Sequence, residues 1–355
     1  MGADSENNAI KITLEDLQNV STPEFTIPNR AIAPTTDGAK SYGNVSTSGD
    51  ENSQISESKG SVLLQGWFYL GLAGLLGAVV GWGICEPAFV DAQNLHRWGN
   101  TWMLPAIIAA LCVGFGLAES IVERSTKKAA LRTVLALPLG LVFGFFFDVF
   151  ANLVYNVGLG IAVSLGAHDN RNPIVWIARG IGWVVFGIAG GLVYGIIGQS
   201  AKKAKYGILG GMLGAGVGGV IFDPIAIGLN GAAMSRLAGF ALFGLATGAA
   251  MGVVESALKD RWLYVSAGPL AGKQFILYKQ ITKIGSSQQC DIYLFKDQNI
   301  LPEHAILETR GSKVQLRASG PVYVTGQPVQ TRVLQDGDFI QVGRYGFRYK
   351  EKQKS

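Results

Sequence analysis

The sequence predicts an α-helical membrane bundle followed by a small all-β sandwich. Residues 61–258 are nearly all apolar and rich in glycine. Within that block, one helical-hairpin pattern recurs three times. After Leu258, short alternating runs punctuated by turn residues replace the apolar blocks, which is typical of strands. We therefore expect a disordered polar tail over 1–60, a Gly-rich membrane domain over 61–258, a β module over 259–350 and a short tail over 351–355.

The polar tail contains nine acids and four bases and is rich in Ser, Thr, Asn and Gly. Such a segment buries too little apolar surface to offset the entropy of ordering, so we expect it to be disordered. Its start has no basic region followed by an apolar stretch, so we expect an internal span to drive membrane insertion.

A membrane-spanning helix needs about 20 mostly apolar residues. Six segments satisfy this length, and residues 151–166, which follow the third of them, are also fairly apolar. No turn signal separates 151–166 from the third span, so we interpret them as a bent or re-entrant extension; a separate crossing would change the topology. The six segments are Gly66–Cys85, Trp102–Val122, Thr133–Phe150, Ile174–Gln199, Tyr206–Phe222 and Arg236–Leu258.

Internal repetition is the strongest evidence for three hairpins. The stretch from Lys127 to Asp148 aligns without gaps with the stretch from Lys202 to Asp223. Among the even spans, RGIGWVVFGIAGG matches RLAGFALFGLATG, and the second and sixth spans end in the similar sequences GLAES and GVVES. Each repeat is one helical hairpin.

Glycine spacing indicates how the hairpins pack, because small residues at every fourth position let helix backbones approach closely in lipid. The same faces would also suit homo-oligomerisation, and the sequence does not separate the two uses. The glycines in this pattern are Gly74, Gly77 and Gly81, then Gly187, Gly191 and Gly195, then Gly207, Gly211, Gly214 and Gly218.

Loop charge predicts the orientation. One side of the membrane has ten Lys and Arg residues in its loops and the other has four. The positive-inside rule places the richer side, and with it both termini, in the cytoplasm. We therefore expect a multi-pass protein of the cell membrane, a bacterial inner membrane, in contact with anionic lipid.

Acids end the three odd spans and arginines precede the even ones, all at the non-cytoplasmic edge. We expect each arginine to pair with the acid that ends the preceding span, forming a clasp across the outer loop. The alternative is an ion or proton path, since ionisable groups in membranes are often functional. The residues are Glu86, Asp148 and Asp223 with Arg97, Arg179 and Arg236.

Several function classes have no support in the sequence. It contains no phosphate loop, nucleophile elbow or metalloprotease motif, so we expect neither an enzyme nor a cofactor. The three cysteines form no Cys/His pairs at metal-ligand spacing, so we expect no metal. No basic stripe interleaved with aromatic residues appears, so we expect no nucleic acid.

Short runs from Phe275 to Tyr349, separated by turns such as Gly285–Ser286 and Asp336–Gly337, predict a sandwich of eight to ten strands. Their landmarks are Ile284–Gly285, Asp291–Ile292, His304–Ala305 and Asp336–Gly337–Asp338. With these landmarks, residues 268–349 resemble a forkhead-associated (FHA) domain. The resemblance implies an eleven-stranded sandwich that binds phosphothreonine peptides through loops at one end.

Carried over residue by residue, the resemblance gives altered binding loops. The family's phosphate-pairing Arg is Ser286 here, its phosphate-bonding Ser is Leu301, and its Asn-Gly-Thr stretch begins at Gly320. His304 is retained, and in the family it mainly braces the loops. Ser286, Ser287 and Lys296 remain as polar candidates, so we name Ser286, Ser287, Lys296, Leu301 and Gly320 as the candidate peptide-binding residues.

Two functions remain open. In the first, the module recruits a cytoplasmic protein partner, with or without a phosphothreonine, for signalling or scaffolding. A phosphorylated Thr13 of the chain's own tail, with Asp16 three residues on, is a variant of that partner. In the second, the repeated bundle is a membrane pore or transporter regulated by the module, since many transport folds are duplicated.

Overall fold

Apolar runs between polar loops form helices in the first part of the chain, and alternating runs form strands in the second. The computed structural model describes residues 61–90, 97–229, 231–311 and 313–352. The predicted polar tail, with Thr13, lies outside these residues. In the described part, six long helices precede eleven strands, as predicted for the fold class.

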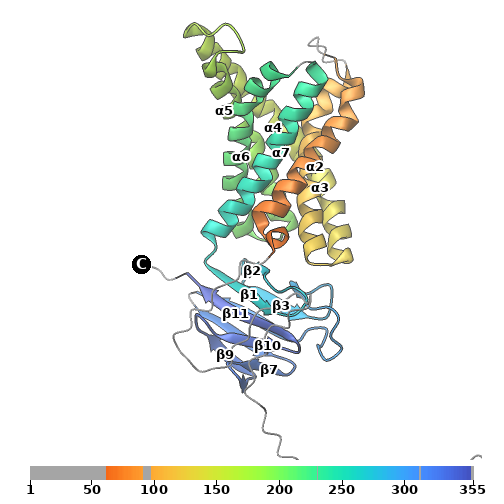
Figure 1. Ribbon diagram of the computed structural model, residues 1–355, viewed down its shortest axis with the longest axis vertical. Coiled ribbons are helices and arrows are strands. Elements are labelled where there is room, and N and C mark those ends of the chain that lie inside the picture. Colours follow the sequence, from red (N-terminus) through yellow and green to blue (C-terminus); the bar gives the residue numbers. More distant parts are fainter. Residues whose placement is uncertain (1–60, 91–96, 230, 312, 353–355) are drawn as a thin grey trace, which may run out of the picture. The chain divides into compact units, whose positions relative to one another are not determined.

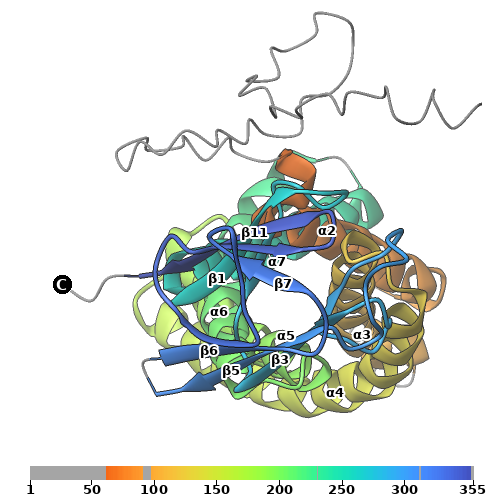
Figure 2. The ribbon, with the colours of Figure 1, turned by 90° about the horizontal axis from the view of Figure 1, so that it is seen from below.

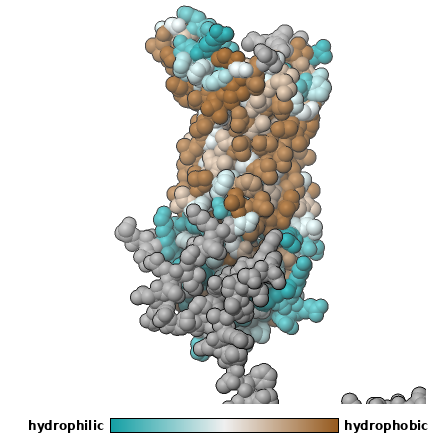
Figure 3. Space-filling model, viewed as in Figure 1, coloured by the Kyte–Doolittle hydropathy of each residue, from teal (hydrophilic) through white to brown (hydrophobic). Residues whose placement is uncertain are grey.

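Each of the six helices is long and apolar enough to cross a membrane. Their sides form a continuous apolar belt in the view of Figure 3, with hydrophilic residues at both ends. The short 3-10 turns η1 (Val62–Leu64) and η2 (Glu86–Ala88) flank the first long helix. The helices are α2 (Gly66–Cys85), α3 (Trp98–Val122), α4 (Thr126–Ser164), α5 (Pro173–Ile197), α6 (Ala201–Gly228) and α7 (Ala232–Leu258).

The loops that precede α4 and α6 are built in the same way, 75 residues apart. Ser125 and Ser200 are the N-caps, and their hydroxyls accept hydrogen bonds from the backbone amides of Lys128 and Lys203 at 3.3 and 3.2 Å. The residue before each cap has a positive φ, 54° at Arg124 and 52° at Gln199. The sequence repeat is therefore also a repeat of backbone geometry.

Helix α4 differs from the expected third span. Residues 151–164 continue it as one helix, so they extend the third span as expected and do not cross separately, whereas the re-entrant alternative is wrong. Asn152 and Asn156 do not interrupt the helix because their side chains donate to the carbonyls of Asp148 and Asn152, one turn earlier. Its 39 residues span about 58 Å at 1.5 Å per residue, well beyond a hydrocarbon core of about 30 Å.

The helices pack as a closed ring in chain order, each against the next and α7 against α2 (Figures 1 and 2). We call the ring the bundle. The ends of the helices nearest the strands form its module-side end, and the opposite ends form its far end. The most apolar stretch of α4 is the least buried of the six, with 22% of its residues buried, and many of the long apolar side chains of α4 are exposed.

Glycine determines the closest approaches in the ring. A side chain at Gly187 of α5 would collide with the backbone of Gly211 in α6, and one at Gly244 of α7 would collide with the backbone of Gly74 in α2. In lipid such close van der Waals contact is the main attraction between helices. Gly187, Gly211 and Gly74 from the predicted glycine faces therefore pack inside the chain and are not free for a second copy.

The strands form a sandwich of two sheets, which we call the module. One sheet has the strand order β2-β1-β11-β10-β7-β8 and the other β4-β3-β5-β6-β9. All pairs are antiparallel except β3 with β4. The strands are β1 (Arg261–Ala267), β2 (Gln274–Ile276), β3 (Ile281–Gly285), β4 (Ile292–Tyr293), β5 (Ala305–Arg310), β6 (Lys313–Ala318), β7 (Val322–Val324), β8 (Gln327–Pro328), β9 (Thr331–Leu334), β10 (Phe339–Val342) and β11 (Tyr345–Glu351).

The sequence runs located most of these strands but missed β1, β8 and β9. Strand β1 follows α7 after two residues and pairs with β11 along its length, which joins the bundle directly to the second strand of the six-stranded sheet. Its inward residues Leu263 and Val265 are fully buried against Ile340 and Phe347 in the module core. The alternation in β1 is obscured by Trp262 and Tyr264 on its other face.

Candidate functional site

Three loops meet at one end of the module, where the FHA resemblance predicts the peptide site. His304 connects two of them. Its Nδ1 accepts a hydrogen bond from the backbone amide of Leu301 at 3.0 Å, and its Nε2 lies 3.0 Å from the carbonyl oxygen of Pro321. Nε2 therefore carries the proton and donates. A side chain at Gly320 would collide with the imidazole ring, so glycine is needed there.

The predicted polar candidates are mostly engaged within the module. The Ser286 hydroxyl donates to the carbonyl of Ile300 at 2.7 Å, and the Ser287 hydroxyl accepts from the amide of Gln289 at 3.2 Å. Lys296 is exposed, in a backbone conformation with φ of 63°. Of these three, only the Lys296 ammonium is free of a hydrogen bond or ion pair to other described residues.

Apolar side chains occupy the tip of this end. Leu301 is 44% exposed, and Pro302 and Pro321 beside it are exposed as well. His304 holds the two loops that carry them together. We call this end of the module the loop tip; it combines these three exposed apolar residues with the exposed Asn299, Glu303 and Ser319 near them in the chain, at the position where the resemblance predicts phosphate contacts.

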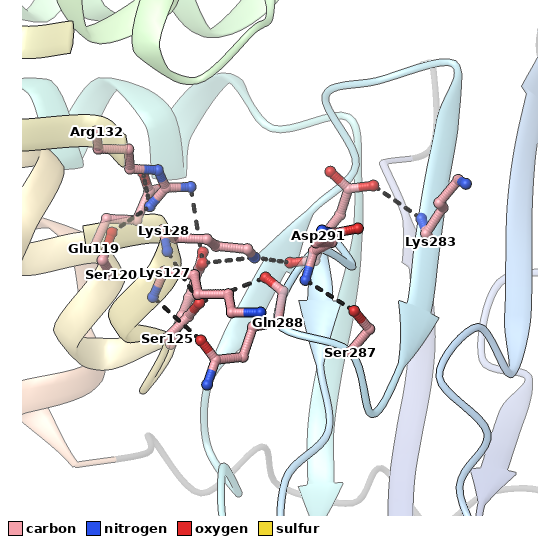
Figure 4. Close-up of polar contacts among 12 residues, drawn as sticks. Glu119, Ser120, Ser125, Lys127, Lys128, Arg132, Lys283, Ser287, Gln288 and Asp291 are labelled. Carbon is pink, nitrogen blue, oxygen red and sulfur yellow. Dashed lines mark hydrogen bonds and ion pairs between the residues drawn. The ribbon is translucent and has the colours of Figure 1, made fainter. Parts of the chain in front are cut away.

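The remaining loop, between β3 and β4, contacts the bundle (Figure 4). The side-chain oxygen of Gln288 accepts hydrogen bonds from the backbone amide of Lys127 at 3.1 Å and from the Thr126 hydroxyl at 3.4 Å. Lys127 lies in the first turn of α4, where backbone amides have no partner within the helix. Gln288 therefore caps a bundle helix from the module.

Two further contacts accompany this cap. The Lys128 ammonium donates to the backbone carbonyl of Asp291 at 2.9 Å (Figure 4). The Arg124 guanidinium lies 5.2 Å from the ring centre of Phe295. The positive charges of the α3–α4 loop thus face the module, and one of the three predicted binding loops is occupied by the chain itself.

The far end of the bundle contains the predicted ion pairs, but with different partners. Arg179 of α5 pairs with Asp223 of α6 at 2.8 Å, and Arg236 of α7 pairs with Glu86 at 2.5 Å. The expected pairing with the acid of the preceding span is therefore wrong. The ring brings α6 beside α5 and α2 beside α7, so each arginine reaches the acid of its other neighbour.

The other two residues of the predicted ion pairs, Asp148 and Arg97, do not pair with each other or with the other four. The Asp148 carboxylate accepts a hydrogen bond from the Asn152 side chain at 2.9 Å, within α4. Arg97 is exposed at the N-terminus of α3 and has no ion pair with any residue in the described ranges. The far end thus contains two clasps between neighbouring helices.

A denser charged cluster lies at the module-side end. Glu119 of α3 pairs with Lys203 of α6 at 2.5 Å and with Arg132 of α4 at 3.0 Å. Glu123 pairs with Lys128 at 3.0 Å. Lys203 is only 3% exposed, and its ammonium lies 4.1 Å from the ring centre of Tyr194. These pairs connect α3, α4, α5 and α6 beneath the module.

Sequence reasoning missed this cluster, although a signal was present. Glu119 lies in GLAES, at the end of the second span, and Glu255 lies in the matching GVVES of the sixth. The two acids occupy equivalent positions in two repeats. The sequence prediction of ion pairs nevertheless included only the acids that end the odd spans. Glu255 is 5% exposed, although most acids are solvated.

The comparisons with known proteins concern the module. A family model described as "Inner membrane component of T3SS, cytoplasmic domain" matches residues 264–353. The glycogen accumulation regulator GarA of Mycolicibacterium smegmatis is 33% identical over 101 residues, which are 28% of this chain and 63% of that protein. The oxoglutarate dehydrogenase inhibitor of Corynebacterium efficiens is 35% identical over 86 residues, 23% of this chain and 60% of that protein.

Solved structures match the same segment. The FHA domain of CT664 from Chlamydia trachomatis is 24% identical and covers 26% of this chain and 99% of its own, with a TM-score of 0.25. The cytoplasmic domain of the T3SS sorting platform protein PscD from P. aeruginosa is 25% identical and covers 27% of this chain and 83% of its own, with a TM-score of 0.24. The FHA resemblance predicted for the module is confirmed.

Proposed function

We propose that this chain is a protein of a bacterial inner membrane whose FHA-like module lies in the cytoplasm and recruits a protein partner through the loop tip. Arg124 of the α3–α4 loop and Lys128 in the first turn of α4 contact the module, and basic residues beside the spans favour the cytoplasmic side. The description of the matching family model, an inner-membrane component with a cytoplasmic domain, supports the same orientation.

The loop tip is the observation that carries the proposal. Leu301 stands 44% exposed where the resemblance predicts a phosphate-binding serine, and Ser286 and Ser287 use their hydroxyls inside the module. Losing charge-assisted contacts to phosphate removes about 1.5–3 kcal/mol each. A braced apolar tip suits burial against an apolar partner surface instead. Lys296 keeps an ammonium group near the tip that has no hydrogen bond or ion pair to other described residues, but with the Ser286 hydroxyl engaged we expect recognition to depend more on the apolar residues than on phosphate.

The pore or transporter alternative receives less support from the bundle interior. Trp183 of α5 packs against Phe222, Phe240 and Phe243 of α6 and α7, with ring centres 4.9–5.9 Å apart. Phe115 of α3 packs against Tyr194 at 6.1 Å. Such aromatic contacts fill the space between helices and favour a scaffold.

A crosslinking experiment tests the proposal. A photoreactive side chain replaces Leu301 in the full chain, in membranes of the native host, and crosslinked products are identified by mass spectrometry. Val333 of β9 is the matched control because it is 46% exposed and pairs toward the other end of β6. We expect a protein adduct at position 301 that is absent at 333 and lost on Pro321→Asp. Equal adducts at both positions would refute the assignment of the loop tip.

A further inference from the structure

A cavity of about 510 Å³ lies between the module-side end of the bundle and the module. Glu119, Arg132, Lys203 and Glu255 line it from the helices, and Lys273 and Tyr278 line it from the module. A second cavity of about 380 Å³ shares Glu255 and Lys273 with the first. Both cavities are therefore walled by the bundle on one side and by the module on the other.

Three polar groups on these walls lack partners. The Lys273 ammonium, one Glu255 carboxylate oxygen and the Tyr278 hydroxyl are buried and have no hydrogen-bond partner within the described parts of the chain. Lys273 is 5% exposed, and its ammonium lies 4.6 Å from the ring centre of Phe275. A buried charge without a partner is costly, so these groups indicate a ligand.

The charge balance of the walls indicates that this ligand is an anion. Glu119 and Glu123 have ion pairs with Lys203, Arg132 and Lys128, and Asp291 has one with Lys279. These three acids are therefore neutralised by cations, whereas Glu255, the fourth acid on the walls, has no ion pair among the described residues. The first cavity is still lined by six Lys and Arg residues against four acids, so its walls have a net positive charge. Lys273 is the buried cation on these walls that has no ion pair to other described residues, and burial lowers its pKa to about 8. An anion beside Lys273 would stabilise its charged form and raise this pKa again.

The cavity walls continue onto lipid-facing surface. Leu131 lines the first cavity and is 56% exposed on the outer side of α4, and Trp67 lines the second and is 41% exposed on α2. Exposed Trp is enriched at the membrane interface. A ligand with both an anionic head and an apolar tail fits this combination of a charged cavity and apolar exits.

We propose that the cavity binds the phosphate group of an anionic phospholipid, with Lys273 as its cation, so that a lipid joins the module to the bundle. Glu255 and Tyr278 then take the hydroxyl groups of the headgroup, as acceptor and as donor. The group that the cavity recognises is a phosphate. The exposed apolar residues beside the cavities favour a phospholipid, and not free phosphate, as the molecule that carries it.

The test uses the delipidated full chain in detergent. Native mass spectrometry measures retention of phosphatidylglycerol, of phosphatidylcholine with the same acyl chains, and of inorganic phosphate. We expect phosphatidylglycerol to be retained and its affinity to fall about tenfold in Lys273→Gln, the loss of one charge-assisted contact. Lys273→Arg should restore it. Lys313→Gln, the same charge change at an exposed site, should leave it unchanged.

The Lys273→Gln variant should fold, because the substitution removes an unpaired buried charge. A melting temperature without lipid that equals or exceeds that of the wild type would confirm that the variant is folded. Equal retention of both lipids, or retention unaffected by Lys273→Gln, would overturn the proposal. Phosphate binding that depends on Lys273 while neither lipid is retained would overturn the lipid source. No protein partner is present, so the result is independent of the partner-recruitment proposal.

Discussion

The side-chain oxygen of Gln288 lies 3.1 Å from the backbone nitrogen of Lys127, so a residue of the module caps a helix of the bundle. This contact occurs at the loop where the FHA resemblance predicts phosphate recognition. The chain therefore uses one predicted binding loop for its own assembly and leaves the loop tip around Leu301 exposed.

Gln288→Ala should loosen the module from the bundle. It removes the acceptor of two hydrogen bonds, each contributing about 0.5–1.5 kcal/mol. Amide hydrogen exchange in the first turn of α4, residues 126–129, should accelerate severalfold. Gln289→Ala, at the exposed neighbouring position, should leave the exchange unchanged. Equal exchange in both variants would show that the cap does not hold the module.

Lys203→Met should destabilise the bundle strongly. It leaves Glu119 buried with one cation in place of two, and breaking a buried pair costs about 3–5 kcal/mol. The measurement is the free energy of unfolding in mixed detergent and dodecyl sulfate. Lys202→Met removes a neighbouring cation that is 32% exposed, and it should cost less than about 1 kcal/mol. Similar losses would contradict the role of the cluster.

Gly187→Ala should weaken the contact between α5 and α6, because the added methyl group meets the backbone of Gly211. We expect a loss of about 1–3 kcal/mol, typical of overpacking. Gly190→Ala is the control in the same helix, since a side chain there meets no atom within 4 Å. It should be neutral or stabilising by about 0.5–1 kcal/mol through helix propensity. The same unfolding assay distinguishes the two variants.

The pKa of Lys273 predicts a pH dependence of stability. Burial lowers this pKa to about 8 in the folded chain, whereas an unfolded chain holds the proton to about 10.4. The unfolded state binds more protons between these values, so the penalty of burying the charge is complete below pH 8 and falls as pH rises. Without lipid, the stability of the wild type relative to Lys273→Gln should rise across this window. A flat difference would contradict the burial of an unpaired ammonium.

The sequence correctly predicted those helices and loops whose local residue pattern also determines how they pack. The starts of α4 and α6 could be aligned from the repeated Lys pairs, and both begin at Ser caps 75 residues apart. The landmarks around His304 located the braced loops of the module. In these regions, residues close in the chain determine the geometry.

Errors arose where distant segments meet. Arg236 pairs with Glu86, 150 residues away, because the ring closes between α7 and α2, and no local pattern specifies that closure. The contact of Gln288 with α4 depends on how the module meets the bundle. The cluster around Glu119 was hidden because its residues lie near the end of one span or the start of another, where charged residues are common.

The most direct test of the account titrates the full chain, in lipid nanodiscs, with a phosphothreonine peptide library and its unphosphorylated twin. We predict that phosphorylation does not increase the affinity of any peptide. A peptide that binds should lose its binding in Leu301→Asp but keep it in Val333→Asp. Micromolar binding that vanishes without phosphate would contradict the account, and its persistence in Leu301→Asp would place the phosphate site away from Leu301.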